Sequence, residues 1–81
     1  MRARRGSWAQ LAAYRQPDGA VRFQRSVAAD HGWLAPLLGI VDGEAIFKLQ
    51  AGPYASREEA QATADRVREE LRLVPLIVER R

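Results

Sequence analysis

The chain has 81 residues and no cysteine, and its 13 lysine and arginine residues against 10 acidic residues give a net charge of +3. This length allows one domain, and because so short a chain buries only about 60% of its unfolded surface, it leaves little room for a deep catalytic cleft. The lack of cysteine excludes a disulfide framework and a thiolate metal site, the single histidine (His31) cannot build a histidine site, and an apolar content of 47% argues against intrinsic disorder.

A strand is predicted over residues 7–14, because two kinds of side chain alternate at its start. Trp8 and Gln10 point to one side, while Ala9 and Leu11 point to the other. This alternation is typical of a strand with two different faces.

Residues 16–19 are turn formers, and they separate this strand from a helix predicted over residues 19–31. Asp18 is expected to be the N-cap, because its side chain can accept a hydrogen bond from a backbone N–H of the first turn. Apolar residues at helical spacing follow, and the pair His31-Gly32 is expected to end the helix.

The middle of the chain predicts two strands joined by a tight turn. Residues 33–41 are an apolar run expected to form a strand, which Pro36 confines to a sheet edge or a bulge because proline cannot donate to a ladder. The turn is expected at residues 42–43, where aspartate precedes glycine. A further strand is expected over residues 45–51, and the glycine and proline at 52–53 are expected to stop it.

The second predicted helix has the clearest signals. Ser56 and Glu59 fit a capping box, in which the serine accepts from a backbone N–H and the glutamate reaches back. The apolar stripe that follows comprises Ala60, Ala64, Val67 and Leu71. Residues 73–79 are rich in β-branched side chains and are expected to form the last strand.

The order β-α-β-β-α-β predicts an α+β fold of the split-βαβ, RNP-like type. This is a two-layer sandwich in which two helices cover one face of a four-stranded antiparallel sheet, with the first and third strands as the central pair. The two halves align without gaps, so that Gln10 matches Gln50 and Tyr14 matches Tyr54. We interpret each tyrosine as the end of its strand, with its ring packed on the helix that follows.

Because the helices cover only one sheet face, the opposite face is a candidate site. The predicted strands place there Trp8, Gln10, Ile46, Lys48, Gln50, Leu76 and Val78. Amides beside apolar surface suit a carbohydrate, whose hydroxyl groups need donors and acceptors while its C–H faces need apolar contact. A half-exposed sheet face whose amides only tie neighbouring strands together explains the same residues equally well.

No pattern indicates catalysis, and we expect neither a metal nor a cofactor. The carboxylates are scattered over expected turns and solvent-facing helix sides, no serine has a suggestive histidine partner, and there is no glycine-rich phosphate loop. His31 is expected at a helix end. The apolar run at residues 33–41 is too short to span a membrane, and no secretory signal is visible.

The basic excess lies at the two ends of the chain. Three cations fall in the first five residues, and Arg80 and Arg81 are the last two residues, which leaves eight cations against ten acids between them. A near-neutral body argues against nucleic acid as a partner, because phosphate binding needs a clustered basic face. We interpret residues 1–6 as a linker or tail, the cations at both ends as unimportant for function, and residues 7–81 as the domain.

Two segments resemble the SPOR (sporulation-related repeat) domain family. Residues 9–14 (AQLAAY) and 49–60 (LQAGPYASREEA) are similar to its twofold pattern, close to VQLGAF or VQxGPY followed by a helix with an early alanine. The resemblance covers residues 7–80 and is sharper in the second half. Ala12 departs from the pattern, since the family usually has glycine there, so the first strand is expected to pack or bulge differently.

The resemblance implies a function and a location. SPOR domains bind peptidoglycan glycan strands that lack stem peptides, and so localise proteins to the division septum. A non-catalytic, monomeric module without membrane insertion is therefore expected, in the periplasm, as part of a larger exported or lipid-anchored protein. Residues 33–38 and 73–81 are similar to the rare lipoprotein A family of septal lytic transglycosylases, which implies a parent enzyme of that kind.

The resemblance also implies the residues that contact the glycan. They correspond here to Gln10, Ala13, Ile46, Lys48 and Gln50, to which the open sheet face adds Trp8 and Leu76. Ala13 is often serine in relatives, so a hydroxyl contact is missing here. Lys48 stands where relatives often have a basic residue, and it is suited to the lactyl carboxylate of N-acetylmuramic acid.

Two other functions are compatible with the predicted topology. RNA recognition motifs share it, but they display stacked aromatic side chains on the central strands, where this sequence offers only Trp8. A protein-interaction domain is the other, through an apolar patch of Ile46, Leu76 and Val78.

Overall fold

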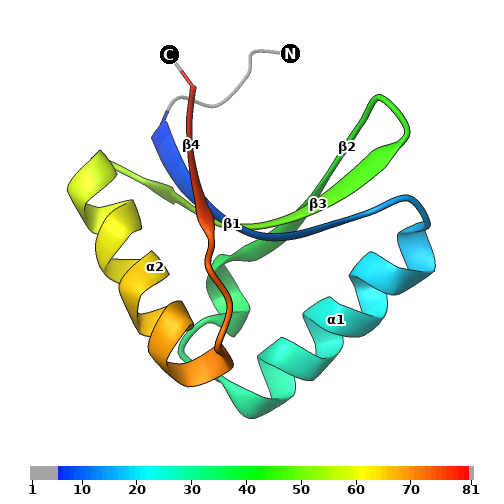
Figure 1. Cartoon of the computed structure of the whole chain (residues 1–81), viewed down its shortest axis with the longest axis horizontal. Coiled ribbons are helices and arrows are strands. Elements are labelled where there is room, and N and C mark those ends of the chain that lie inside the picture. Colours follow the sequence, from blue (N-terminus) through cyan, green and yellow to red (C-terminus); the bar gives the residue numbers. More distant parts are fainter. Residues whose placement is uncertain (1–5, 81) are drawn as a thin grey trace.

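The computed structural model describes residues 6–80, and it contains four strands, two α-helices and a short 3₁₀ helix. In chain order these are β1 (Gly6–Tyr14), α1 (Pro17–Asp30), η1 (Ala35–Leu37), β2 (Leu38–Gly43), β3 (Ile46–Tyr54), α2 (Arg57–Leu71) and β4 (Leu76–Arg80). The sheet is antiparallel with the order β2-β3-β1-β4, and both helices lie on one side of it (Figure 1). The predicted α+β fold and its central strand pair are confirmed. The predicted tail lies outside the described residues except for Gly6, which begins β1.

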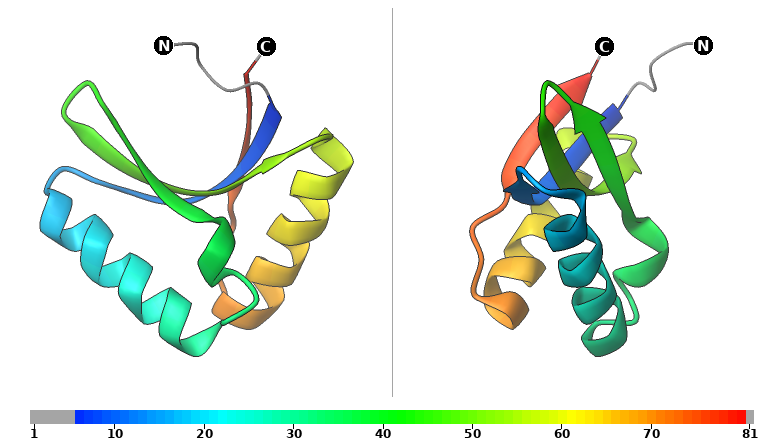
Figure 2. Two further views of the ribbon diagram at one scale, coloured as in Figure 1. Left: turned by 180° about the vertical axis from the view of Figure 1, so that it is seen from behind. Right: turned by 90° about the vertical axis from the view of Figure 1, so that its right-hand side faces the viewer.

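The sheet is strongly curved, and its open face is concave (Figures 1 and 2). The β2–β3 hairpin rises on one side, and β4 with the start of β1 rises on the other. The pairing of β1 with β3 shifts register between Ser7 and Ala9 and again between Gln10 and Ala12. Such irregularities bend strands and increase their twist, which accounts for the curvature.

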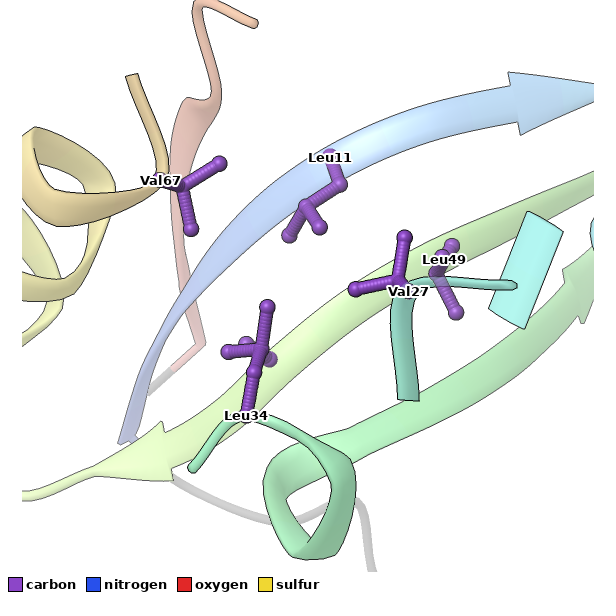
Figure 3. Packing of buried hydrophobic residues seen from close by; sticks show 6 residues of the cluster. Leu11, Val27, Leu34, Leu49 and Val67 are labelled. Carbon is purple, nitrogen blue, oxygen red and sulfur yellow. The ribbon is translucent and has the colours of Figure 1, made fainter. Parts of the chain in front are cut away.

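The hydrophobic core lies between the sheet and the helices. Figure 3 shows its buried cluster, which comprises Leu11, Val27, Leu34, Leu49, Ala51 and Val67. The predicted helical stripe is confirmed, because Ala60, Ala64 and Val67 of α2 are buried. Alanines at the contact let the helix approach the sheet closely.

Helix α1 begins two residues earlier than predicted. Its N-cap is Gln16, which makes no side-chain capping bond, and Pro17 occupies the first turn, where its missing N–H costs nothing. The prediction that Asp18 is the N-cap is therefore wrong, and its carboxylate instead lies in the first turn, where the helix dipole favours negative charge. His31 is the C-cap residue, as expected.

The prediction of a strand from residue 33 is wrong, because residues 33–37 form turns and the 3₁₀ helix η1. The backbone N–H of Leu37 donates to the carbonyl of Leu34, and the Leu34 side chain is completely buried in the core. Burial of this leucine turns the chain inward before β2 begins. Pro36 belongs to η1 and not to β2, although β2 is the edge strand that was expected.

The hairpin turn lies two residues later than predicted. Gly43 still pairs with Ile46, so the turn consists of Glu44 and Ala45, both with positive φ (50° and 65°). Two positive φ angles are typical of the tight turn that matches strand twist. The Asp-Gly signal was overridden because the register is set by core residues such as Ile40, which pairs with Leu49.

Strand β3 does not stop at Gly52-Pro53 but continues through this cis peptide bond to Tyr54. Strand β4 starts at Leu76 and not at residue 73, because Arg72 adopts the left-handed conformation that ends α2 and a connection follows.

The predicted capping box of α2 is confirmed for its serine. The Ser56 hydroxyl accepts from the Glu59 N–H at 3.2 Å. The Glu59 carboxylate reaches back as expected, but it accepts from the N–H of Ala55 at 2.9 Å. The helix start is thus held from both sides.

Both tyrosines pack as predicted. The Tyr14 ring lies 6.2 Å from the Phe23 ring of α1, and the Tyr54 hydroxyl accepts from Thr63 of α2 at 2.7 Å.

Candidate functional site

The strand register brings the predicted site residues to one surface, the open face of the sheet. Gln10 pairs with Gln50 on β3 and with Leu76 on β4, while Ala13 pairs with Lys48. Directly opposed residues of antiparallel strands project to the same side. Ile46 precedes Lys48 by two residues and Trp8 precedes Gln10 by two, so all seven residues lie on this face, as does Val78 opposite Trp8.

A bulge in β1 explains how Gln10 and Ala13, three residues apart, face the same side. Gln10 and Ala12 are two residues apart on β1, yet they pair with consecutive residues of β3. Leu11 is therefore the extra residue of the bulge. Simple alternation would have turned Ala13 towards the core, whereas the bulge leaves it exposed and Leu11 buried. Ala12, where the family has glycine, sits in this bulge without a positive φ.

The two glutamines form an amide pair at the centre of the open face. Gln50 Nε2 donates to Gln10 Oε1 at 3.1 Å, and Gln50 is only 3% exposed. Gln10 is half-buried and takes part in this pair through its oxygen, so its own amide N–H groups are not used in the pair. The Oε1 atom of Gln50 is buried and has no partner among the described residues, so the pair lacks one donor for full satisfaction.

Trp8 forms the floor of the face rather than an exposed platform. Its side chain packs against Gly52, where an added Cβ would lie 2.7 Å from Trp8 Cδ1, and Gly52 has a φ of +149°. Trp8 is only 8% exposed, and the Arg80 guanidinium lies 5.4 Å from its ring centroid. Glycine at position 52 is thus required by close approach and by backbone conformation together.

Two hollows occupy the open face. The larger has a volume of about 470 Å³, and the residues along it include Trp8, Gly39, Val41, Gln50, Pro53 and Arg80. The smaller has a volume of about 270 Å³ and lies against the β2–β3 hairpin, lined by Val41, Asp42, Gly43, Glu44, Ile46, Lys48 and Arg80. A shallow, elongated surface with amides, cations and apolar floor suits an extended ligand with polar and C–H surfaces.

Arg80 is the residue that the sequence analysis missed, because it was set aside with Arg81 as terminal charge. The structure places it in β4 on the open face. The alternation of Leu76 and Val78 along the strand was the available signal, since the next residue in that series is Arg80.

Neither alternative function finds support in this geometry. Among the described residues of the open face, Trp8 is the one aromatic side chain, and it is almost completely buried, so no bases can stack there as in RNA recognition. The apolar side chains of Ile46 and Leu76 are exposed by 38% and 62%, but Lys48 and the glutamine pair lie between them. The patch is therefore interrupted by polar groups.

A polar cluster on the helix side holds Trp33, which places this tryptophan away from the open face. Glu70 accepts from Trp33 Nε1 at 3.0 Å and from Arg66 Nε at 2.7 Å, and His31 Nδ1 lies 3.0 Å from it. The hydrogen bonds from Arg66, Trp33 and His31, in that order, lower the pKa of Glu70 from 4.5 to about 2. The Arg66 guanidinium also stacks on the Trp33 ring at 3.9 Å.

Within residues 6–80, no group of three histidine or acidic side chains is arranged to hold a metal ion. Over the same residues, neither helix has the length and apolar character needed to cross a membrane.

The chain belongs to the SPOR domain family, whose pattern it matches over residues 3–79. Two solved structures share its fold. One is the peptidoglycan binding domain of the B. subtilis cell wall lytic enzyme CwlC (TM-score 0.72, 15% identity, covering 100% of this chain and 98% of that one). The other is the RlpA SPOR domain from Pseudomonas aeruginosa (TM-score 0.64, 20% identity, covering 93% of this chain and 100% of that one). No curated protein matches the sequence.

Proposed function

We propose that this domain is a non-catalytic module that binds peptidoglycan, and that it recognises glycan strands lacking stem peptides on the open face of the sheet. The observation that carries the proposal is the Gln10–Gln50 amide pair beside a 470 Å³ hollow on a concave surface. Membership of the SPOR family and the structural likeness to a peptidoglycan binding domain support the same ligand.

The residues divide the recognition between polar and apolar contacts. The amide of Gln10 can donate to sugar hydroxyl or acetamido oxygens, and Gln50 holds that amide in place. Ile46 and Leu76 offer exposed apolar surface to the C–H faces of the sugar rings, and the nearly buried Trp8 supports the face from below. Lys48 can pair with a lactyl carboxylate of the glycan. Ala13 lies beside Lys48, and its small side chain lets the glycan approach the protein backbone.

We further infer that the domain localises a larger periplasmic protein at the division septum. A lytic transglycosylase of the rare lipoprotein A type is the parent that the structural likeness to an RlpA SPOR domain favours. The domain would act there as a monomer, with its catalytic partner elsewhere in the same chain.

Titration with purified glycan strands tests the proposal. Strands with and without stem peptides, and an RNA oligonucleotide, are added to the domain while backbone amide resonances of β1 and β3 are followed. We expect shifts with the strands lacking stem peptides and none with RNA. Unchanged β1 and β3 resonances with both glycans would refute peptidoglycan binding at this face.

A Gln10→Glu variant tests the amide pair directly. The carboxylate still accepts from Gln50 Nε2, so the fold is retained, but the N–H donors are lost and a negative charge faces the acidic glycan. We expect affinity to fall about tenfold or more, as for loss of hydrogen bonds to a charged or buried group. Gln24→Glu on α1, on the opposite side of the sheet, is the matched control and should bind normally. Equal binding by Gln10→Glu would remove Gln10 from the site.

A further inference from the structure

Arg80, the last residue of β4, lies where the two hollows of the open face meet. Its guanidinium lies over the Trp8 ring, 5.4 Å from the ring centroid. Arg80 and Val41 are the two residues that line both hollows, and they come from the opposite edge strands β4 and β2. A ligand that extends from one hollow into the other must therefore pass this guanidinium.

Arg80 and Lys48 are the cations that line these hollows. Among residues 6–80, neither forms an ion pair, and the neighbouring acid Glu79 is already paired with Arg57. A guanidinium supported on an indole ring has its position restricted while its N–H donors stay directed outwards. The planar fork of those donors matches a carboxylate, which it can bind through two parallel hydrogen bonds.

We propose that Arg80 binds the lactyl carboxylate of a muramic acid residue and thereby makes this face selective for strands that have lost their stem peptides. This inference rests on the proposed function. In peptide-bearing strands the lactyl group is tied up in an amide bond and carries no charge. Hydrolysis of that amide by a separate enzyme releases the peptide amine and leaves a carboxylate, so the removal of each peptide creates the anion that Arg80 recognises.

Chemically modified strands test the proposal. Glycan strands without stem peptides are used as the free acid and after conversion of their lactyl carboxylates to methyl esters, which removes the charge and adds little bulk. Both are titrated into the wild-type domain and into Arg80→Met, Arg80→Lys and Arg25→Met, the last being an exposed cation of α1 on the helix side. Dissociation constants come from the β1 and β3 amide resonances, whose dispersion also reports that each variant is folded.

The wild-type domain should bind the free acid more tightly than the ester by roughly tenfold or more, because Arg80 and Lys48 can each make a charge-assisted contact to a carboxylate. Arg80→Met should lose the Arg80 share of that preference, roughly tenfold, by weakening on the free acid alone, while Lys48 keeps the rest. Arg80→Lys should keep part of it, because the charge remains without the planar fork, and Arg25→Met should behave as wild type.

Two outcomes with Arg80→Met overturn the inference. Wild-type affinity in a folded Arg80→Met excludes Arg80 from the site, and an equal loss on acid and ester shows that Arg80 only supports Trp8. If Arg80→Met does not fold, Arg80→Lys is compared with the wild type on the same two ligands. A lysine variant that keeps the full preference for the free acid over the ester shows that the planar guanidinium is not required. If the wild-type domain binds neither the free-acid nor the esterified glycan, the proposed function itself fails. The two outcomes with Arg80→Met leave the proposed function intact.

Discussion

Gly52 is the position at which a single methyl group should disturb both the fold and the floor of the open face. In Gly52→Ala the new Cβ would lie 2.7 Å from Trp8 Cδ1 and 3.1 Å from the Ser7 carbonyl oxygen. The backbone φ of +149° is one that side-chain-bearing residues rarely adopt. Trp8 is nearly buried, so the ring cannot move aside without losing its own packing.

The magnitude follows from these two effects. A residue forced into such a backbone region costs on the order of 1–3 kcal/mol, and an extra methyl group in a packed site costs a similar amount. The free energy of unfolding should therefore fall by about 4 kcal/mol, which is a large share of the total for a domain of this size. For 60–100 residues each kcal/mol lowers the melting temperature by roughly 4–8 °C, so a fall of at least about 16 °C is expected.

Urea denaturation followed by far-UV circular dichroism measures the change. Gly39→Ala is the matched control, because Gly39 also lies in a strand, has no neighbour within 4 Å of an added Cβ and has no positive φ in the strained range. It should be neutral or slightly stabilising. A loss below about 1 kcal/mol in Gly52→Ala, or an equal loss in both variants, would refute the argument from close approach.

Three further variants probe the helix side. Leu34→Ala should cost about 3 kcal/mol by opening a cavity in the core, measured by urea denaturation, and wild-type stability would show that Leu34 is not buried. Ser56→Ala should cost about 1 kcal/mol through the lost N-cap bond, whereas Ser26→Ala, at an exposed position within α1, should change little. Because the pKa of Glu70 is lowered from 4.5 to about 2, its ionised form stabilises the fold above pH 4.5, and this contribution is lost as the pH falls towards 2. The stability difference between wild type and Glu70→Gln should therefore shrink over that interval, and a constant difference from pH 6 to pH 2.5 would contradict the lowered pKa.

The local patterns of the sequence predicted the elements where one interaction dominates. The capping serine, Ser56, and the alanine stripe of α2 identified a helix that the structure places almost as expected. Predictions were wrong where a local signal competed with burial. The Asp42-Gly43 pair does not form the turn, because packing of the hairpin core sets a different register. The apolar run from residue 33 begins with turns and not with a strand, because Leu34 is buried in the core.

By itself, the sequence determined the order of strands and helices, the repeated glutamines and the family resemblance. These depend on short-range spacing and on residue identity, both of which can be read along the chain. Only the tertiary structure decided that the Gln10 carbonyl oxygen accepts a hydrogen bond from Gln50 Nε2, that a bulge turns Ala13 outwards, and that Arg80 lies over Trp8 between two hollows. Register, bulges and curvature arise from packing between strands that lie far apart in the chain, and a local pattern carries little information about them.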